Sequence, residues 1–411
     1  MAPGRCERDH SKPDARRSSS WVDPRECIGC PHRPTGGQAR NSEVWFGAFS
    51  GLPPTDWWLP RLRVAFVGVW SRARRRRCLG VTGGDGINLC GFCEGRQERL
   101  AALAEALAGG SYQRGSLREY EEAKPDGGTR TIRIPTVGDR VLARVVLQWM
   151  TPRVRLHVGA IGGRPGGSPA EALRRVQEAI REQKEAWVFR ADVVQFFDRV
   201  PRARLFAQLR REVGSSVMCD LAEQLTLPPP TQPEGLVQGV PLSPLLANLY
   251  LMPLDLRLGD HRYVRFVDDV AAVRSSRSAA SRARRQACGV VEALGLEVKD
   301  TDGRTSITRV GADPPPTFLG VELQGANLRV GLRRIRATMA LLGEAERLVS
   351  CRCYEAARVL LSAESVASHY GFCDDPSIAT ALRECRRLRR LLPCPDGIAR
   401  CALDRPHGDD L

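Results

Sequence analysis

Lysine is scarce in this 411-residue sequence, in which only four of the 62 basic residues are lysines, at positions 12, 124, 184 and 299. The formal net charge of +15 and the pI near 9.6 therefore come almost entirely from arginine. Arginine binds phosphate through a planar two-point fork and stacks on bases, whereas lysine provides a compact point charge. We expect a polyanionic partner such as nucleic acid, although a GC-rich genome would also enrich arginine.

Long apolar runs are missing as well. The longest run, residues 64–70, is too short to cross a bilayer, which takes about 20 apolar residues. The first residues are polar and charged, without the apolar segment of an export signal. Fourteen cysteines, several of them in Cys-x-x-Cys pairs, are more typical of metal ligands in a reducing compartment than of disulfides. We expect a cytoplasmic protein that has no membrane partner.

Two Cys-x-x-Cys pairs suggest a zinc site in the N-terminal part of the chain. Cys27, Cys30, Cys90 and Cys93 provide two half-sites of a tetrahedral zinc centre, and glycine in each pair favours a turn that can surround a metal. The long separation between the pairs leaves ordinary free cysteines as an equal alternative. Residues 1–110 are rich in Cys, Trp and Arg, and this composition predicts a separate N-terminal domain.

The centre of the sequence is residues 263–273, where an acidic pair, Asp268 and Asp269, has β-branched and aromatic neighbours on both sides. This composition predicts a β-hairpin with the acidic pair at its tip. Two carboxylates so close together repel each other unless a cation lies between them. The alternative is an exposed turn, since Asp is a common turn residue.

Two earlier segments make the cation site the better interpretation. Alternation over residues 187–192 predicts a strand that places Asp192 on the face opposite Trp187 and Phe189. A Gln238-Gly239 loop then leads into a helix, for which we expect Ser243 to be the N-cap; glycine there allows close approach to a ligand. Convergent carboxylates of this kind suit two divalent ions about 4 Å apart, and oxygen ligands favour Mg²⁺.

Local signals predict further elements around these segments. Ser168 and Glu171 form a capping box that opens a helix with one apolar face. A Pro-Asp-Gly-Gly turn at residues 125–128 predicts a hairpin from which Lys124 and Arg130 project. The segment from Phe318 is expected to be a strand, and the chain from residue 328 onwards to be mostly helical.

The order of these segments resembles the reverse transcriptase family over roughly residues 111–345. Residues 189–198 (Phe-Arg-Ala-Asp-Val-Val-Gln-Phe-Phe-Asp) look like the first palm motif. Residues 235–251 resemble the Gln-Gly and Ser-Pro-Leu-Leu-Ala-Asn segment, residues 266–269 the Tyr-x-Asp-Asp box, and residues 318–320 the Phe-Leu-Gly strand. Residues 134–140 and 163–173 look like fingers motifs of group II intron enzymes and the bacterial types derived from them.

The resemblance implies an α+β fold, a right-hand polymerase with fingers, a palm of antiparallel sheet plus helices, and a helical thumb. Fingers and palm would occupy residues 111–327, and the thumb and C-terminal region residues 328–411. It further implies that Asp192 and Asp268 bind two Mg²⁺ ions, with Asp269 assisting. Phe266 stands where the family usually has Tyr, which keeps the ring but removes a hydroxyl.

The same resemblance assigns a nucleotide pocket. Phe197 matches the aromatic gate that excludes a ribose 2′-hydroxyl, with an ordinary core phenylalanine as the alternative. Gln238 would line the pocket, while Lys124 and Arg130 would clamp the triphosphate. Val237 replaces a usual proline, a change that we expect to loosen the loop.

These resemblances imply an RNA-directed DNA polymerase, a nucleotidyltransferase that takes an RNA template and dNTPs and makes a DNA product. Because we find no His-Asn-His nuclease pattern or fused integrase, we expect a stand-alone bacterial enzyme in antiphage defence that uses an associated non-coding RNA. A group II intron-derived mobile-element enzyme and a non-catalytic RNA-binding module remain as alternatives.

Overall fold

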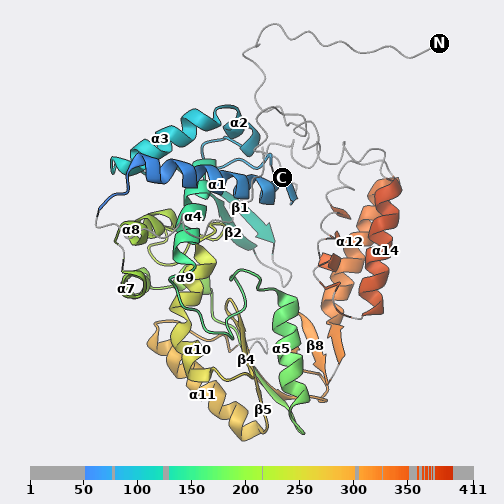
Figure 1. Ribbon diagram of the computed structural model, residues 1–411. Coiled ribbons are helices and arrows are strands. Elements are labelled where there is room, and N and C mark those ends of the chain that lie inside the picture. The colour runs from blue at the N-terminus through green and yellow to red at the C-terminus, as the bar shows by residue number, and fades with distance from the viewer. Residues whose placement is uncertain are drawn as a thin grey trace, which may run out of the picture.

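The computed structural model describes residues 51–391 apart from 76–78, 124–128, 215, 301–304, 326, 351–358 and several positions between 361 and 374. Helices and strands are mixed along this part of the chain, in agreement with the predicted α+β class (Figure 1). None of the helices in the described ranges is long and apolar enough to cross a membrane.

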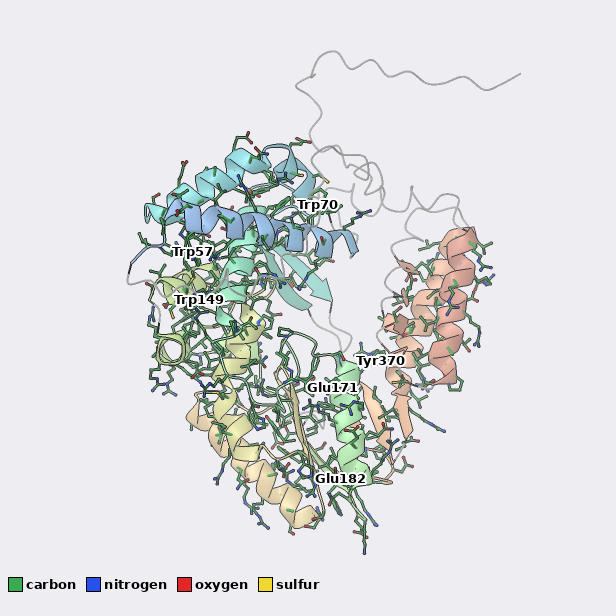
Figure 2. All side chains as sticks on the ribbon, viewed as in Figure 1. Trp57, Trp70, Trp149, Glu171, Glu182 and Tyr370 are labelled. Carbon is green, nitrogen blue, oxygen red and sulfur yellow. The ribbon has the colours of Figure 1, made fainter. Side chains whose placement is uncertain are left out.

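Three N-terminal helices, α1 (Thr55–Arg75), α2 (Leu89–Glu94) and α3 (Arg96–Ala108), cover α4 (Val137–Met150) (Figure 1). Tryptophans of both helices belong to one hydrophobic cluster, and Figure 2 labels Trp57 and Trp70 toward opposite ends of α1 and Trp149 in α4. The hydrophobic cluster that includes Trp57 continues through α4 to Leu296. The predicted boundary at residue 110 therefore does not coincide with a break in the core of the described residues.

The hairpin predicted around the Pro-Asp-Gly-Gly turn is confirmed. Strands β1 (Arg118–Ala123) and β2 (Thr129–Ile134) pair antiparallel, with Arg118 opposite Ile134. Lys124 and the side chain of Arg130 lie outside the described residues, so their proposed contacts with a triphosphate stay a prediction.

The central sheet has the strand order β4-β5-β3-β6, and its paired strands all run antiparallel. Its members are β3 (Trp187–Ala191), β4 (Tyr263–Phe266), β5 (Asp269–Arg274) and β6 (Ser306–Arg309). Because β3 pairs with β5 on one edge and β6 on the other, it lies inside the sheet. The first predicted acidic strand and the acidic hairpin are thus direct neighbours.

Helices cover both faces of this sheet. Phe189 packs in one hydrophobic cluster with α11 (Arg277–Ala293), while Val188 packs in another with α5 (Pro169–Arg181). The Ser168 N-cap is confirmed, since the Glu171 backbone N–H donates to Ser168 Oγ at 3.1 Å, while the Glu171 carboxylate accepts from Arg174 and Arg175. The remaining helices of this region are α6 (Phe196–Arg199), α7 (Arg202–Val213), α8 (Ser216–Leu225), α9 (Ser243–Tyr250) and α10 (Met252–Leu258).

A small three-stranded sheet follows, made of β7 (Thr317–Phe318), β8 (Val321–Gln324) and β9 (Asn327–Val330). The single strand expected from Phe318 is wrong, because Leu319 and Gly320 adopt positive φ values of 50° and 80° and turn the chain between β7 and β8. Helices α12 (Leu332–Ser350) and α14 (Pro376–Leu391) then pack side by side around their own hydrophobic cluster (Figure 1).

Candidate active site

The acidic pair forms the predicted hairpin. Phe266 and Asp269 are opposite each other at the ends of β4 and β5, so Val267 and Asp268 make the two-residue turn between them. Val267 has a φ of +61°, which is unfavourable for a β-branched residue and costs about 1–3 kcal/mol. Surrounding contacts must therefore hold this turn in place.

Asp192 reaches the same end of the sheet from β3. Ala191 is opposite Val270 in the β3–β5 ladder, so the next residue along β3 lies beside the acidic turn. The Lys299 N–H donates to the Asp192 carbonyl at 2.8 Å and fixes the backbone there, and only 9% of Asp192 is exposed. Carboxylates that are 76 residues apart in sequence are thereby brought together by strand pairing.

Burial and mutual repulsion act strongly on Asp268. Loss of solvent, followed by the neighbouring charges of Asp269 and Asp192, raises the pKa of the Asp268 carboxyl to about 7. A carboxylate that is costly to ionise among other carboxylates becomes favourable once a cation neutralises it. The electrostatics of the turn therefore fit a bound divalent cation.

Asp269 is placed differently from the other two carboxylates. Its Oδ1 lies 3.6 Å from Nη2 of Arg190, whose Nη1 also donates to Thr317 Oγ1 at 3.0 Å. Among the described residues, no group of three or more His, Cys, Asp or Glu side chains is arranged to hold a metal ion. The metal-binding roles of Asp192 and Asp268 and the assisting role of Asp269 therefore stay predictions.

The Gln238-Gly239 loop contacts the fingers hairpin. The Arg133 N–H of β2 donates to the Gln238 carbonyl at 2.9 Å. Gly239 has a φ of +116°, and a Cβ at this position would lie 2.4 Å from the Arg133 carbonyl oxygen. The expectation that this glycine allows approach of a ligand is corrected here, since the close neighbour is the backbone of β2. Gln238 itself is partly buried, and its role in nucleotide binding stays a prediction.

Ser243 also differs from the expectation. It is the first residue of α9 rather than its N-cap, which is Leu242. Its hydroxyl donates to the Val237 carbonyl at 2.6 Å, so it ties the preceding loop to the helix. Val237 is fully buried. The side chain that replaces proline therefore packs in the core, which opposes the expected loosening.

Phe197 follows Asp192 by five residues and lies in the short helix α6. The core position in this helix belongs to its neighbour Phe196, which is 1% exposed, while Phe197 is only partly buried. The two rings are 5.6 Å apart. A partly accessible ring is compatible with the predicted sugar gate, which no contact in this structure tests.

Two arginines near the acidic turn were not singled out from the sequence. Arg190 lies two residues before Asp192, and Arg265 lies three residues before Asp268. Arg265 is completely buried. The available signal was a charge within an otherwise apolar strand, because a fully buried arginine requires dedicated partners.

The structure describes two of the four predicted zinc ligands. Cys27 and Cys30 lie outside the described residues. Cys90 and Cys93 are in helix α2 instead of the expected glycine-containing turn, and Cys93 is buried. Zinc binding by these four cysteines stays a prediction.

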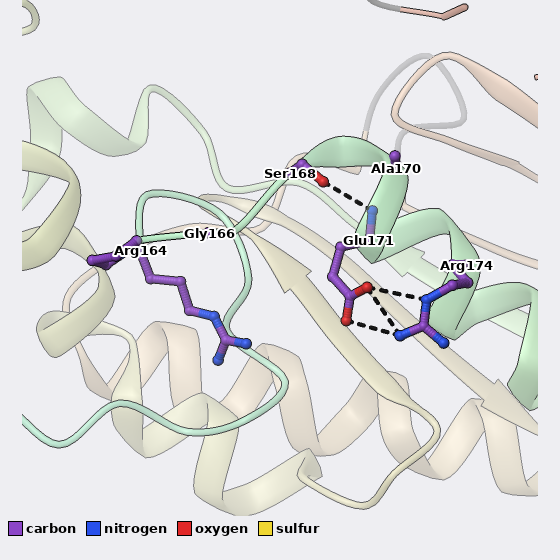
Figure 3. A pocket seen from close by; sticks show the side chains of 7 residues that line it. Arg164, Gly166, Ser168, Ala170, Glu171 and Arg174 are labelled. Carbon is purple, nitrogen blue, oxygen red and sulfur yellow. Dashed lines mark hydrogen bonds and ion pairs between the residues drawn. The ribbon is translucent and has the colours of Figure 1, made fainter. Parts of the chain in front are cut away.

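A pocket of about 510 Å³ lies beside the N-terminus of α5 (Figure 3). Arg174 lines the pocket and donates hydrogen bonds to the Glu171 carboxylate. Hydrogen bonds from Arg175 and Arg174 lower the pKa of the Glu171 carboxyl. The lining includes neither Asp192 nor Asp268. Asp268, whose pKa is raised, and the strand neighbours beside it mark the candidate active site rather than this pocket.

Comparison with known proteins adds a family match. The sequence model described as reverse transcriptase (RNA-dependent DNA polymerase) matches residues 123–323, which contain Asp192, Gln238 and the acidic turn. Protein YkfC of Escherichia coli (strain K12) is 28% identical over 194 residues, 44% of this chain and 51% of that protein. The chain thus spans about half the length of this curated relative.

Solved structures of yeast telomerases show a weaker likeness. Apo telomerase of Candida tropicalis, truncated from its C-terminal domain, gives a TM-score of 0.40 at 12% identity over 53% of this chain and 54% of that one. Telomerase of Candida albicans in complex with a TWJ fragment of telomeric RNA gives a TM-score of 0.40 at 9% identity. The match covers 70% of this chain and 64% of that one.

Proposed function

Because residues 123–323 form a domain of the reverse transcriptase (RNA-dependent DNA polymerase) family, we propose that the whole chain is an RNA-directed DNA polymerase. The observation that carries this proposal is the convergence of Asp192 and Asp268. They come from separate strands to one end of the antiparallel sheet, where burial and repulsion leave Asp268 in need of a cation.

In the proposed mechanism Asp192 and Asp268 hold Mg²⁺, with Asp269 assisting through its position beside Arg190. When bound, two such ions neutralise the attacking 3′-oxygen and the leaving pyrophosphate. Asp192 is 9% exposed, and loss of solvent raises the pKa of the Asp268 carboxyl, so both carboxylates attract a cation more strongly than they would in bulk water.

The nucleotide contacts in this mechanism come from the family resemblance. Gln238 lines the nucleotide pocket, and Phe197 excludes a 2′-hydroxyl. Lys124 and Arg130 in the fingers hairpin bind the triphosphate, which suits the fork geometry of arginine. The hydrogen bond between Arg133 and Gln238 couples this hairpin to the pocket.

Primer extension tests the polymerase proposal. Wild-type protein with an RNA template, a DNA primer, dNTPs and Mg²⁺ is expected to extend the primer. Asp268→Asn is expected to abolish extension while RNA affinity stays within a few-fold, because the substitution removes a metal ligand and leaves the basic surfaces intact. RNA binding without any extension by the wild type would instead favour the non-catalytic RNA-binding alternative.

For the biological role, we propose that this is a cytoplasmic antiphage-defence enzyme that copies an associated non-coding RNA. Support comes from residues 134–140 and 163–173, which resemble motifs of group II intron enzymes and the bacterial types derived from them. Cells that express the wild type should resist phage plating and yield one enriched RNA with the purified protein, whereas Asp268→Asn should keep the RNA and lose resistance. Enrichment of an intron RNA without phage resistance would favour the mobile-element alternative.

A further inference from the structure

A buried polar network lies directly behind the acidic turn. Arg265 of β4 is completely buried, and Asp255, Asn248 and Tyr263 around it are at most 1% exposed. The network is separate from the carboxylates proposed to bind metal. Since burying an ion pair costs desolvation energy that apolar packing avoids, its presence here calls for a role beyond stability.

Every N–H group of the Arg265 side chain has an acceptor. Nε and Nη2 donate to the two oxygens of Asp255 at 2.7 and 2.6 Å. Nη1 donates to Asn248 Oδ1 at 2.8 Å, and Nη2 makes a longer contact of 3.4 Å with the Asn248 carbonyl. The guanidinium is therefore fixed in position and orientation by α9 and α10.

The remaining hydrogen bond of Arg265 reaches the active-site turn. Nη1 donates to the Val267 carbonyl at 2.7 Å, directly before Asp268. Val267 is the residue with the unfavourable φ of +61°. A fixed donor that holds this carbonyl opposes relaxation of the turn to an ordinary conformation.

The loop before α5 supports the turn from its other side. Asn248 Nδ2 donates to the Gly162 carbonyl at 2.7 Å. A Cβ on Gly162 would lie 2.6 Å from the Val267 nitrogen, so the two backbones are in close contact. The same asparagine thus orients Arg265 and holds the segment that packs on the turn.

We propose that Arg265 is a positioning residue, which Asp255 and Asn248 orient so that it holds the Val267 carbonyl and keeps Asp268 directed toward Asp192. This inference rests on the proposed polymerase function. It assigns Arg265 no contact with substrate: the residue acts through the backbone of the turn. Displacement of a reacting group by about 1 Å can reduce a rate by about 10²-fold.

The test compares two substitutions in the network. Arg265→Lys keeps the charge beside Asp255 but cannot hold Asp255, Asn248 and Val267 together. Tyr263→Phe is the matched control, because the Tyr263 hydroxyl donates to Asp255 at 2.7 Å and makes no contact with Val267. Thermal unfolding reports how much of any effect is general destabilisation.

In primer extension, Arg265→Lys should reduce kcat by about 10–100-fold and raise the Mg²⁺ concentration for half-maximal rate several-fold, with little change in KM for dNTP. Tyr263→Phe should stay within about three-fold of the wild type on all three quantities. Equal kinetic losses in the two variants, or losses in proportion to the unfolded fraction, would overturn the proposal.

A second substitution tests the strained turn itself. Glycine adopts a positive φ without steric cost, so adding Val267→Gly to Arg265→Lys should recover at least about five-fold in rate. No recovery would contradict the positioning role.

If Arg265→Lys does not fold, Asn248→Ala takes its place, because it leaves the Arg265–Asp255 pair intact. It should raise the Mg²⁺ requirement in the same way, and an unchanged requirement would overturn the inference. An inactive wild type would refute the polymerase proposal itself and is distinguished from these results by the wild-type and Asp268→Asn reactions.

Discussion

At the scale of single residues, the acidic turn combines function with local instability. Asp268 lies beside two other carboxylates and is partly shielded from solvent, and its neighbour Val267 adopts a left-handed conformation. Both features cost stability in the absence of a ligand, which is typical of residues that serve a site rather than the fold.

Asp268→Asn should stabilise the metal-free protein while it abolishes primer extension. The amide has nearly the same shape but no charge, so the desolvation and repulsion that act on the carboxylate disappear. We expect a gain of about 1–3 kcal/mol in the free energy of unfolding in EDTA at pH 8, measured by urea denaturation. Lower stability of Asp268→Asn in EDTA would show that the carboxylate is satisfied without a cation.

Phe197→Ala should allow ribonucleotides into the pocket. The partly buried ring is predicted to block a 2′-hydroxyl, and its removal opens that space. The ratio of kcat/KM for dNTP over rNTP should fall by about ten-fold or more, while Phe197→Tyr, which keeps the ring, should preserve it. Unchanged discrimination in Phe197→Ala would make Phe197 an ordinary packing residue.

At the scale of elements, the site depends on contacts between segments that are far apart in sequence. Strand β3 brings Asp192 to the hairpin β4–β5, and β2 meets the Gln238-Gly239 loop. The contact between β2 and this loop does not tolerate a side chain at position 239. Gly239 has a positive φ, and an added Cβ would lie 2.4 Å from the Arg133 carbonyl oxygen.

Gly239→Ala should therefore lower stability and polymerase rate together. The new methyl group must displace β2 or the loop, so we expect a loss of about 1–3 kcal/mol. Gly289→Ala in α11 is the control, because an added Cβ there meets nothing within 4 Å and alanine favours helix by about 0.5–1 kcal/mol. Urea denaturation of both variants measures the difference. An equal effect of the two substitutions would contradict a tight contact between β2 and the loop.

At the scale of the whole molecule, the N-terminal helices share a hydrophobic core with the region that carries the site. Trp57 of α1, Val145 of α4 and Phe189 of β3 belong to one cluster. By contrast, α12 and α14 pack around a cluster of their own. A metal bound by the N-terminal cysteines would therefore be linked to a segment that packs on the polymerase region.

Zinc is expected at about one ion per chain in protein purified under reducing conditions. Elemental analysis measures it, and less than about 0.2 zinc per chain would rule out a stoichiometric structural site. Cys90→Ser should remove the metal and weaken RNA binding, because we expect the zinc site to fix the arginine run at residues 74–77, which lies between the two cysteine pairs in the sequence. Extension of a simple primer–template should persist. Cys219→Ser, which changes a buried cysteine outside both pairs, should retain zinc.

The sequence by itself determined the elements of the site. Alternation predicted β3, the acidic pair predicted the hairpin, and the capping box predicted the start of α5. These features depend on the spacing of neighbouring residues, which periodicity and capping chemistry govern locally. The order of the motifs also indicated the family that the sequence comparison supports.

Only the tertiary structure decided which residues support the site. The sequence shows Arg265 only as a charge within an apolar strand, and its partners Asp255 and Asn248 lie on two separate helices. Gly239 could have faced a ligand, and the fold places β2 against it instead. Such contacts depend on how distant segments pack, and a buried charge or a close backbone contact leaves no periodic signal in the chain.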